Sequence, residues 1–171
     1  MKRLALLLVA PLSLGSSSGT ITDAYKDAGR RLNIDWQTLY QIGAVESSHR
    51  PGVVARKCSE RDRKNNNCAS GLMQTKYTTA LEVCPKIKRA DLFDPYISAY
   101  CGGKYYAKQL KLSGSKPIAL GRYTEGPTGY ERAKLQNTEH RRKRWKVVTS
   151  YVAKVESVTP PPQQTWWIYG L

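Results

Sequence analysis

The sequence predicts a single, mainly α-helical domain, and three observations support this. Apolar residues recur at helical spacing in several segments, whereas strand signals are weak. These segments are bounded by residues that typically cap or begin helices. The chain has 171 residues, of which 40% are hydrophobic, and this length suits one domain with a hydrophobic core.

Three helices are expected in the first half of the chain. The first covers about residues 21–32, and the second begins at Asp35, a favourable N-cap residue. The third is expected from Thr78 to Val83, where Pro85 follows. Between the second and third, residues 49–70 contain many charges, a Pro-Gly pair and three consecutive asparagines, so this segment is expected to be irregular.

Three further helices are expected in the second half. Asp94-Pro95 is a strong helix start, because the acid caps and the proline suits the first turn, and this helix should end near Gly114. A short helix should open at Pro117 and end at Gly126-Pro127. The last helix should follow Thr138. Its buried stripe would consist of Trp145, Val148, Val152 and Val155.

The two ends of the chain differ from this domain. Residues 1–19 have two basic residues, an apolar run and then small residues, which is the layout of a secretory signal peptide, and the run is too short to span a bilayer. The alternatives are an uncleaved anchor or a virion packing segment. We expect a protein that is exported to the periplasm or faces the cell wall, of bacterial or phage origin.

The folded domain would then occupy residues 20–156, and residues 157–171 form a proline-rich spacer and an aromatic tail. In that tail Trp166 and Trp167 could dock on the domain, contact a protein partner or lie at a membrane interface.

The four cysteines fit an oxidising compartment, and they allow three pairings. We favour Cys58 with Cys68 and Cys84 with Cys101, because each pair closes a short local loop. Zinc is the competing interpretation, but the chain has no Cys-x-x-Cys spacing and only two histidines. Neither a metal site nor a cofactor is therefore expected.

The charge balance predicts an anionic partner. Lys and Arg total 28 against 13 Asp and Glu, a formal net charge of +15, with one dense run over residues 140–144 that is either a solvated helix start or an anion contact. Acidic lipid, an anionic cell wall and nucleic acid all fit this charge. No helix-turn-helix, zinc-finger or RNA-binding aromatic motif accompanies it, so nucleic acid is not the expected partner.

Glu46 is the residue whose environment points most directly to chemistry. It follows Leu39 by seven positions and Ile42 by four, so the three side chains share the apolar face of the second helix. Burial and the negative end of the helix dipole both raise a carboxyl pKa there, as a glycosidic general acid requires. The alternative is a glutamate that is paired with one of the many Lys or Arg residues.

The residues around Glu46 add a family resemblance. In chain order they are Glu46-Ser47, Ser70-Gly71-Leu72-Met73-Gln74, Thr79-Ala80, Asp94-Pro95, Gly103-x-x-Tyr106, Ala119 to Pro127 and Tyr151-Val152. This series resembles, in order and approximate spacing, the catalytic domain of soluble lytic transglycosylases, the goose-lysozyme-like family. The resemblance covers about residues 21–155 and implies a lysozyme-like α (α+β) domain with helices around a saccharide-binding cleft.

The resemblance also implies roles. Glu46 matches the single acid/base, which would cleave the β-1,4 bond between N-acetylmuramic acid and N-acetylglucosamine with formation of a 1,6-anhydro ring. Ser47 and Gln74 match residues that orient the acid and hold N-acetyl groups, Met73 matches a groove wall and Tyr123 matches an aromatic near the acid. The remaining predicted substrate-binding positions are Ser70, Gly71, Thr124 and Glu125.

Independently of the family, Gly71 would let backbone approach a sugar, and the Gln74 amide can both donate to and accept from an acetamido group. In the plainer alternative Met73 and Tyr123 belong to the core and Gln74 is a solvated residue at a helix start.

The sequence departs from the family at Thr124, where asparagine is usual, and at Glu125, where a small residue is usual. Glu125 is therefore either an exposed replacement or a candidate second carboxylate. Glu60 and Asp62 are also candidates, because they lie where goose-type lysozymes supply the acid that positions water.

A second carboxylate would keep hydrolysis by a goose-type lysozyme open, since hydrolases use two. A noncatalytic wall-binding module is the other alternative. We expect a monomer that acts on peptidoglycan strands.

Overall fold

The structure, a computed structural model, describes residues 20–162 of the chain. The predicted signal peptide and the tryptophans of the tail lie outside these residues. The elements, in order, are α1 (Ile21–Leu32), α2 (Trp36–Ser47), α3 (Glu60–Lys64), α4 (Tyr77–Val83), the 3₁₀ helix η1 (Arg89–Phe93), α5 (Pro95–Ser113), α6 (Lys116–Glu125), α7 (Pro127–Lys134) and α8 (Glu139–Glu156).

The predicted helix starts are confirmed by their caps. Asp35, Asp94 and Thr138 each accept a hydrogen bond through the side chain from a backbone N–H two or three residues further along. These bonds satisfy N–H groups that would otherwise have no partner at the start of a helix. The beginnings of α2, α5 and α8 are therefore set by local sequence.

Three short elements were not predicted. α3 has five residues, none of them buried, so it carries no apolar stripe. η1 is also five residues long. α7 begins at Pro127, directly after Gly126, whose φ of 72° redirects the chain between α6 and α7. The Gly-Pro pair thus ends one helix and starts another.

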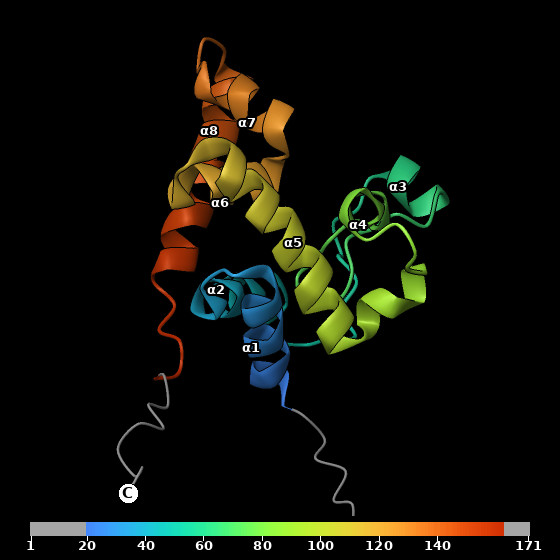
Figure 1. Cartoon of the computed structure of the whole chain (residues 1–171). Helices are drawn as coiled ribbons and strands as arrows, with labels where there is room; N and C mark the ends of the chain where they lie inside the picture. Colours follow the sequence, from blue (N-terminus) through green and yellow to red (C-terminus); the bar gives the residue numbers. More distant parts are fainter. Residues whose placement is uncertain (1–19, 163–171) are drawn as a thin grey trace, which may run out of the picture.

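The helices are arranged around α5, the longest of them (Figure 1). α1, α2, α4, η1 and α6 all contact α5. α6, α7 and α8 pack on one another near the C-terminal end of α5, whereas α3 and α4 lie on its other side. Within residues 20–162 the extended backbone amounts to two isolated antiparallel bridges, from Ser70 to Val54 and to Thr75, so the domain is mainly α-helical.

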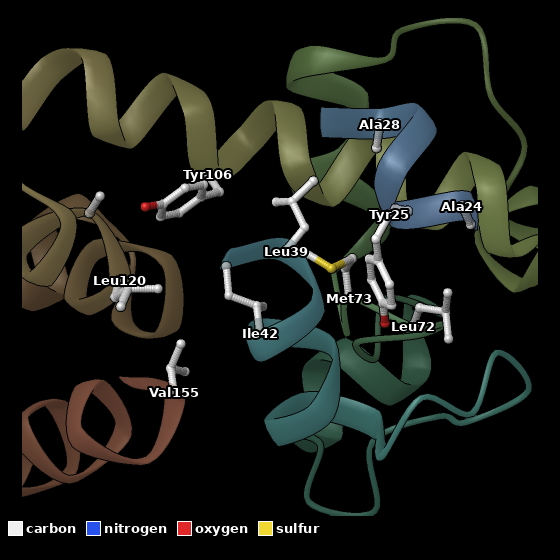
Figure 2. Close-up of a cluster of buried hydrophobic side chains, with 12 residues drawn as sticks. Ala24, Tyr25, Ala28, Leu39, Ile42, Leu72, Met73, Tyr106, Leu120 and Val155 are labelled. Carbon is white, nitrogen blue, oxygen red and sulfur yellow. The ribbon is translucent and has the colours of Figure 1, made fainter. Parts of the chain in front are cut away.

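The main core holds α2 against its neighbours (Figure 2). Leu39 and Ile42 of α2 are fully buried with Tyr106 of α5, Leu120 of α6 and Val155 of α8. Burying side chains of this size contributes roughly 1.5–3 kcal/mol each. Because α1, α5 and α8 all contact α2, its C-terminal end has a fixed position.

Both predicted disulfides are present, one joining Cys58 to Cys68 and the other joining Cys84 to Cys101. The first closes the loop that contains α3, and the second ties the end of α4 to α5. Among the described residues, no helix is both long and apolar enough to cross a bilayer.

Candidate active site

The site begins with the apolar face of α2. Leu39 and Ile42 are fully buried, and Glu46, one turn further along, is partly buried at the end of the same face. α2 ends one residue later, where Ser48 takes a left-handed backbone conformation with φ 53°. The predicted placement of a carboxyl group at the end of this buried stripe is confirmed.

Glu46 is held by a tyrosine from a distant part of the chain. The Tyr151 hydroxyl on α8 donates a hydrogen bond of 2.7 Å to Oε1 of Glu46. Burial raises the pKa of Glu46 to about 7, and the hydrogen bond from Tyr151 lowers it, so burial is the larger effect. Near neutral pH the Glu46 side chain therefore exists as both acid and carboxylate.

A second tyrosine, Tyr123 on α6, lies close to this carboxyl group. Its hydroxyl donates to the backbone carbonyl of Met73 at 2.6 Å and lies 3.4 Å from the Thr75 hydroxyl. Burial and then the nearby Glu46 charge raise the Tyr123 pKa far above its usual value. Tyr123 therefore stays protonated. It forms part of the cleft wall, and its hydroxyl contacts join α6 to residues 73–75.

Glu46 lines a cleft of about 440 Å³. Its lining comes from the end of α2, from the segment before α4, from α4, α5 and the end of α6, and from α8. The lining residues are Glu46, Ala69, Gln74, Thr75, Lys76, Thr79, Tyr105, Tyr123, Thr124, Glu125, Gly126 and Arg144. Polar groups dominate this surface, as is suitable for a saccharide.

Gln74 and Thr124 are predicted binding residues that do line this cleft. The side-chain amide nitrogen of Gln74 donates to the backbone carbonyls of Val53 and Gly71, each at 2.9 Å. With its N–H groups used in this way, Gln74 presents its amide oxygen as an acceptor.

Four other predicted binding residues do not line the cleft. Met73 is fully buried in the core, as in the plainer alternative. Ser47 is buried and donates to the Gly43 carbonyl of its own helix, and Ser70 is buried and donates to the Cys68 carbonyl.

The fourth is Gly71, which has a φ of 78°. A Cβ there would lie 1.9 Å from the Leu92 carbonyl oxygen. Glycine at this position is therefore required by packing against η1 rather than by approach of a sugar.

The three candidate second carboxylates differ in whether they line the cleft. Glu60 lies on exposed α3, where it pairs with Lys64 at 2.8 Å, and Asp62 pairs with Lys76. Neither lines the cleft. Glu125 does line it, but its carboxylate is paired with Arg144 of α8.

The comparison with known families agrees with this geometry. The transglycosylase SLT domain family matches the chain over residues 23–151. The chain belongs to this family. Its members' activity is of the peptidoglycan transglycosylase type, so peptidoglycan is the substrate at the level of the family. No curated protein sequence matches the chain.

For this SLT domain, sequence reasoning missed the contact of Tyr151 with Glu46 and the placement of Lys76 and Arg144 in the cleft. Tyr151 appears in the family series but without a role, and the contact with Glu46 spans 105 residues. Arg144 is one of several cations in the run over residues 140–144, and nothing local distinguishes it. Lys76 belongs neither to the family series nor to the basic run, so nothing in the sequence indicated that it lines the cleft.

Proposed function

We propose that this SLT domain is a lytic transglycosylase that cleaves the β-1,4 bond between N-acetylmuramic acid and N-acetylglucosamine, with Glu46 as its single acid/base. One observation carries the proposal: a partly buried carboxyl group with a pKa of about 7 opens into a polar cleft and accepts a hydrogen bond from Tyr151. A general acid works best when its pKa lies near the operating pH.

The chemistry needs one carboxyl group that acts twice. Protonated Glu46 gives its proton to the glycosidic oxygen as the bond from that oxygen to C1 of the muramic ring breaks. The resulting carboxylate then takes the proton of the C6 hydroxyl, whose oxygen bonds to C1. The product is a 1,6-anhydro ring, Glu46 is protonated again and no water is consumed.

Tyr151 supports the first half of this cycle, in which Glu46 gives up its proton. Its hydrogen bond favours the carboxylate form of Glu46, which exists between the two proton transfers. Tyr123 keeps its own proton and contributes shape, because its hydroxyl already donates to the Met73 carbonyl.

Hydrolysis of the same bond is the second candidate, and the presence of Glu125 in the cleft favours it. A hydrolase would use this second carboxylate to activate water or to stabilise an intermediate. The ion pair with Arg144 disfavours that role, because it occupies the carboxylate.

Mass spectrometry of digested peptidoglycan tests the proposal. We expect 1,6-anhydromuramic ends, and reducing ends would instead establish hydrolysis. Glu46→Gln, which keeps the shape of the side chain, should lower product release by at least roughly 100-fold. Glu82→Gln, an exposed glutamate paired with Lys108, is the matched control and should retain activity. Wild-type-like release by Glu46→Gln contradicts the assignment.

We also propose that the enzyme is exported and works at the cell wall. Its two disulfides support an oxidising compartment, since such bonds are rare in the cytosol. Its formal charge of +15 supports work on an anionic wall.

A further inference from the structure

Two cations line the cleft, and each is backed by a carboxylate. The first is Lys76, whose ammonium lies 2.8 Å from Asp62. Asp62 also accepts hydrogen bonds from the Ser59 hydroxyl and the Asn67 amide. These three contacts, that of Lys76 first, lower the pKa of Asp62 to about 2. Asp62 is therefore a permanent anion that holds Lys76.

The second cation is Arg144, at the α8 wall of the cleft. Its guanidinium pairs with Glu125, the last residue of α6. The Glu125 side chain is 5% exposed, whereas that of Arg144 is 54% exposed. The Glu125 carboxylate is thus buried, whereas the Arg144 guanidinium remains accessible at the cleft.

In both pairs the cation has N–H donors that its carboxylate partner does not use. A guanidinium has five N–H donors and an ammonium has three. Within residues 20–162, Glu125 is the one hydrogen-bond partner of the Arg144 side chain, and Asp62 is that of Lys76. Each cation is half exposed in the cleft and already restrained, so it can bind an anion with a reduced loss of side-chain entropy.

We propose that Lys76 and Arg144 form carboxylate-binding subsites of the cleft, with Asp62 and Glu125 as their positioning residues. This inference rests on the proposed function for its substrate, the glycan strand. Each muramic residue carries a lactyl group, which ends in a free carboxylate or in a peptide with carboxylates of its own. The subsites select strands that carry such groups beside the bond to be cut.

The proposal also gives Asp62 and Glu125 a role different from that of a second catalytic carboxylate. Their oxygens hold cations, and Asp62 does not line the cleft at all. A carboxylate–guanidinium contact is strong and directional, so Arg144 should contribute more than Lys76.

Binding to the full-length Glu46→Gln protein tests the subsites without any need for turnover. Three glycan fragments of equal length serve as probes. One carries peptides with free carboxylates, one carries the same peptides with those carboxylates converted to amides, and one lacks peptides and has free lactyl carboxylates. The parent should bind a carboxylate-bearing fragment roughly tenfold more tightly than the amidated one.

Arg144→Gln and Lys76→Gln should each reduce that preference. Arg144→Gln alone leaves the Glu125 carboxylate buried and unpaired, which costs stability. The double variant Glu125→Gln/Arg144→Gln removes both charges and should lose the preference while remaining folded. Lys143→Gln on α8 and Lys108→Gln on α5 are matched controls, because both lysines are paired with glutamates but do not line the cleft.

The pattern of losses identifies the source of the carboxylate. Weaker binding of the peptide-bearing fragment alone assigns the subsites to the peptide, and a matching loss on the peptide-free fragment assigns them to the lactyl group. Equal losses on all three fragments, or the same losses in the lysine controls, overturn the proposal. A wild-type protein that binds with this preference but releases no product contradicts the proposed function and leaves the subsites standing.

The positioning role of Glu125 has its own readout. Glu125→Gln in the active protein should raise KM for carboxylate-bearing strands and change kcat little, because it disturbs only how Arg144 is held. A fall in kcat that is equal on free and amidated strands shows that Glu125 takes part in the chemistry, and this would refute the positioning role.

Discussion

The Tyr151 hydroxyl is the clearest point at which to test the proposed acid/base. The change Tyr151→Phe removes only the donor of the 2.7 Å hydrogen bond to Glu46 and keeps the ring that packs in the core. Burial of Glu46 is left in place, and burial is the larger influence on its pKa. The variant thus isolates the influence that lowers this pKa.

The expected size of the shift in the Glu46 pKa follows from the strength of this hydrogen bond. A hydrogen bond to a charged group contributes about 1.5–3 kcal/mol, and the protonated carboxyl also accepts a bond, though a weaker one. The difference between the two forms is thus about 1.4 kcal/mol, or about one pKa unit. Tyr151→Phe should raise the pKa of Glu46 from about 7 to roughly 8.

The pH dependence of kcat/KM reports the free enzyme. Since Glu46 must be protonated to act, activity should fall as the pH rises through its pKa, and Tyr151→Phe should move that alkaline limb upward by about one unit. The plateau at lower pH should fall roughly tenfold, because the carboxylate formed after proton donation has lost its donor. Titration of ¹³C-labelled glutamate carboxyl groups by NMR measures the same shift without substrate.

Tyr77→Phe is the matched control. It also removes a tyrosine hydroxyl that donates a hydrogen bond, here to the Ile87 carbonyl at 3.1 Å, but at a position that does not line the cleft. Its pH profile should equal that of the parent. An alkaline limb that stays in place or moves downward in Tyr151→Phe refutes the link between Tyr151 and the protonation of Glu46.

Two further predictions concern stability. The pKa of folded Glu46, about 7, is raised above the ordinary 4.5, so ionisation opposes folding as the pH rises between these values. Glu46→Gln should therefore raise the free energy of unfolding by up to about 3 kcal/mol above pH 7 and by little at pH 4, and equal effects in chemical denaturation at both pH values contradict the buried acid. Gly71→Ala should cost at least about 2 kcal/mol more than Gly114→Ala in the same measurement, because both have positive φ but only Gly71 faces a carbonyl, that of Leu92. Similar losses at both glycines would contradict the packing at η1.

Much of the helical framework could be predicted from the sequence, because its signals are local. Asp35 and Asp94 cap helices through backbone N–H groups only two or three residues away. The short elements were harder to predict, although the Ser59 side chain caps α3 in the same way by accepting a hydrogen bond from the Asp62 N–H. α3 is exposed and has no buried residue to produce periodicity, and Gly126-Pro127 indicated an end although α7 begins there.

The candidate site was predictable only in part. The spacing of Leu39, Ile42 and Glu46 requires a common helical face, so sequence alone placed a carboxyl group at the end of a buried stripe. It could not tell which neighbours of that group face the cleft. Met73 turned out to lie in the core and Gln74 at the cleft, although the two are adjacent in the chain.

The amino-acid sequence by itself determined the longer helices and the place of Glu46 on the apolar face of α2, and it favoured the two short disulfide loops, since each depends on residues close together in the chain. Tertiary structure alone decided that Tyr151, 105 residues away, donates to that carboxyl group, and that Glu125 holds Arg144 instead of standing free. The physical reason is that these contacts depend on how α8 packs on α2 and α6 and how α2 and α6 pack on α5, and no local spacing encodes that packing.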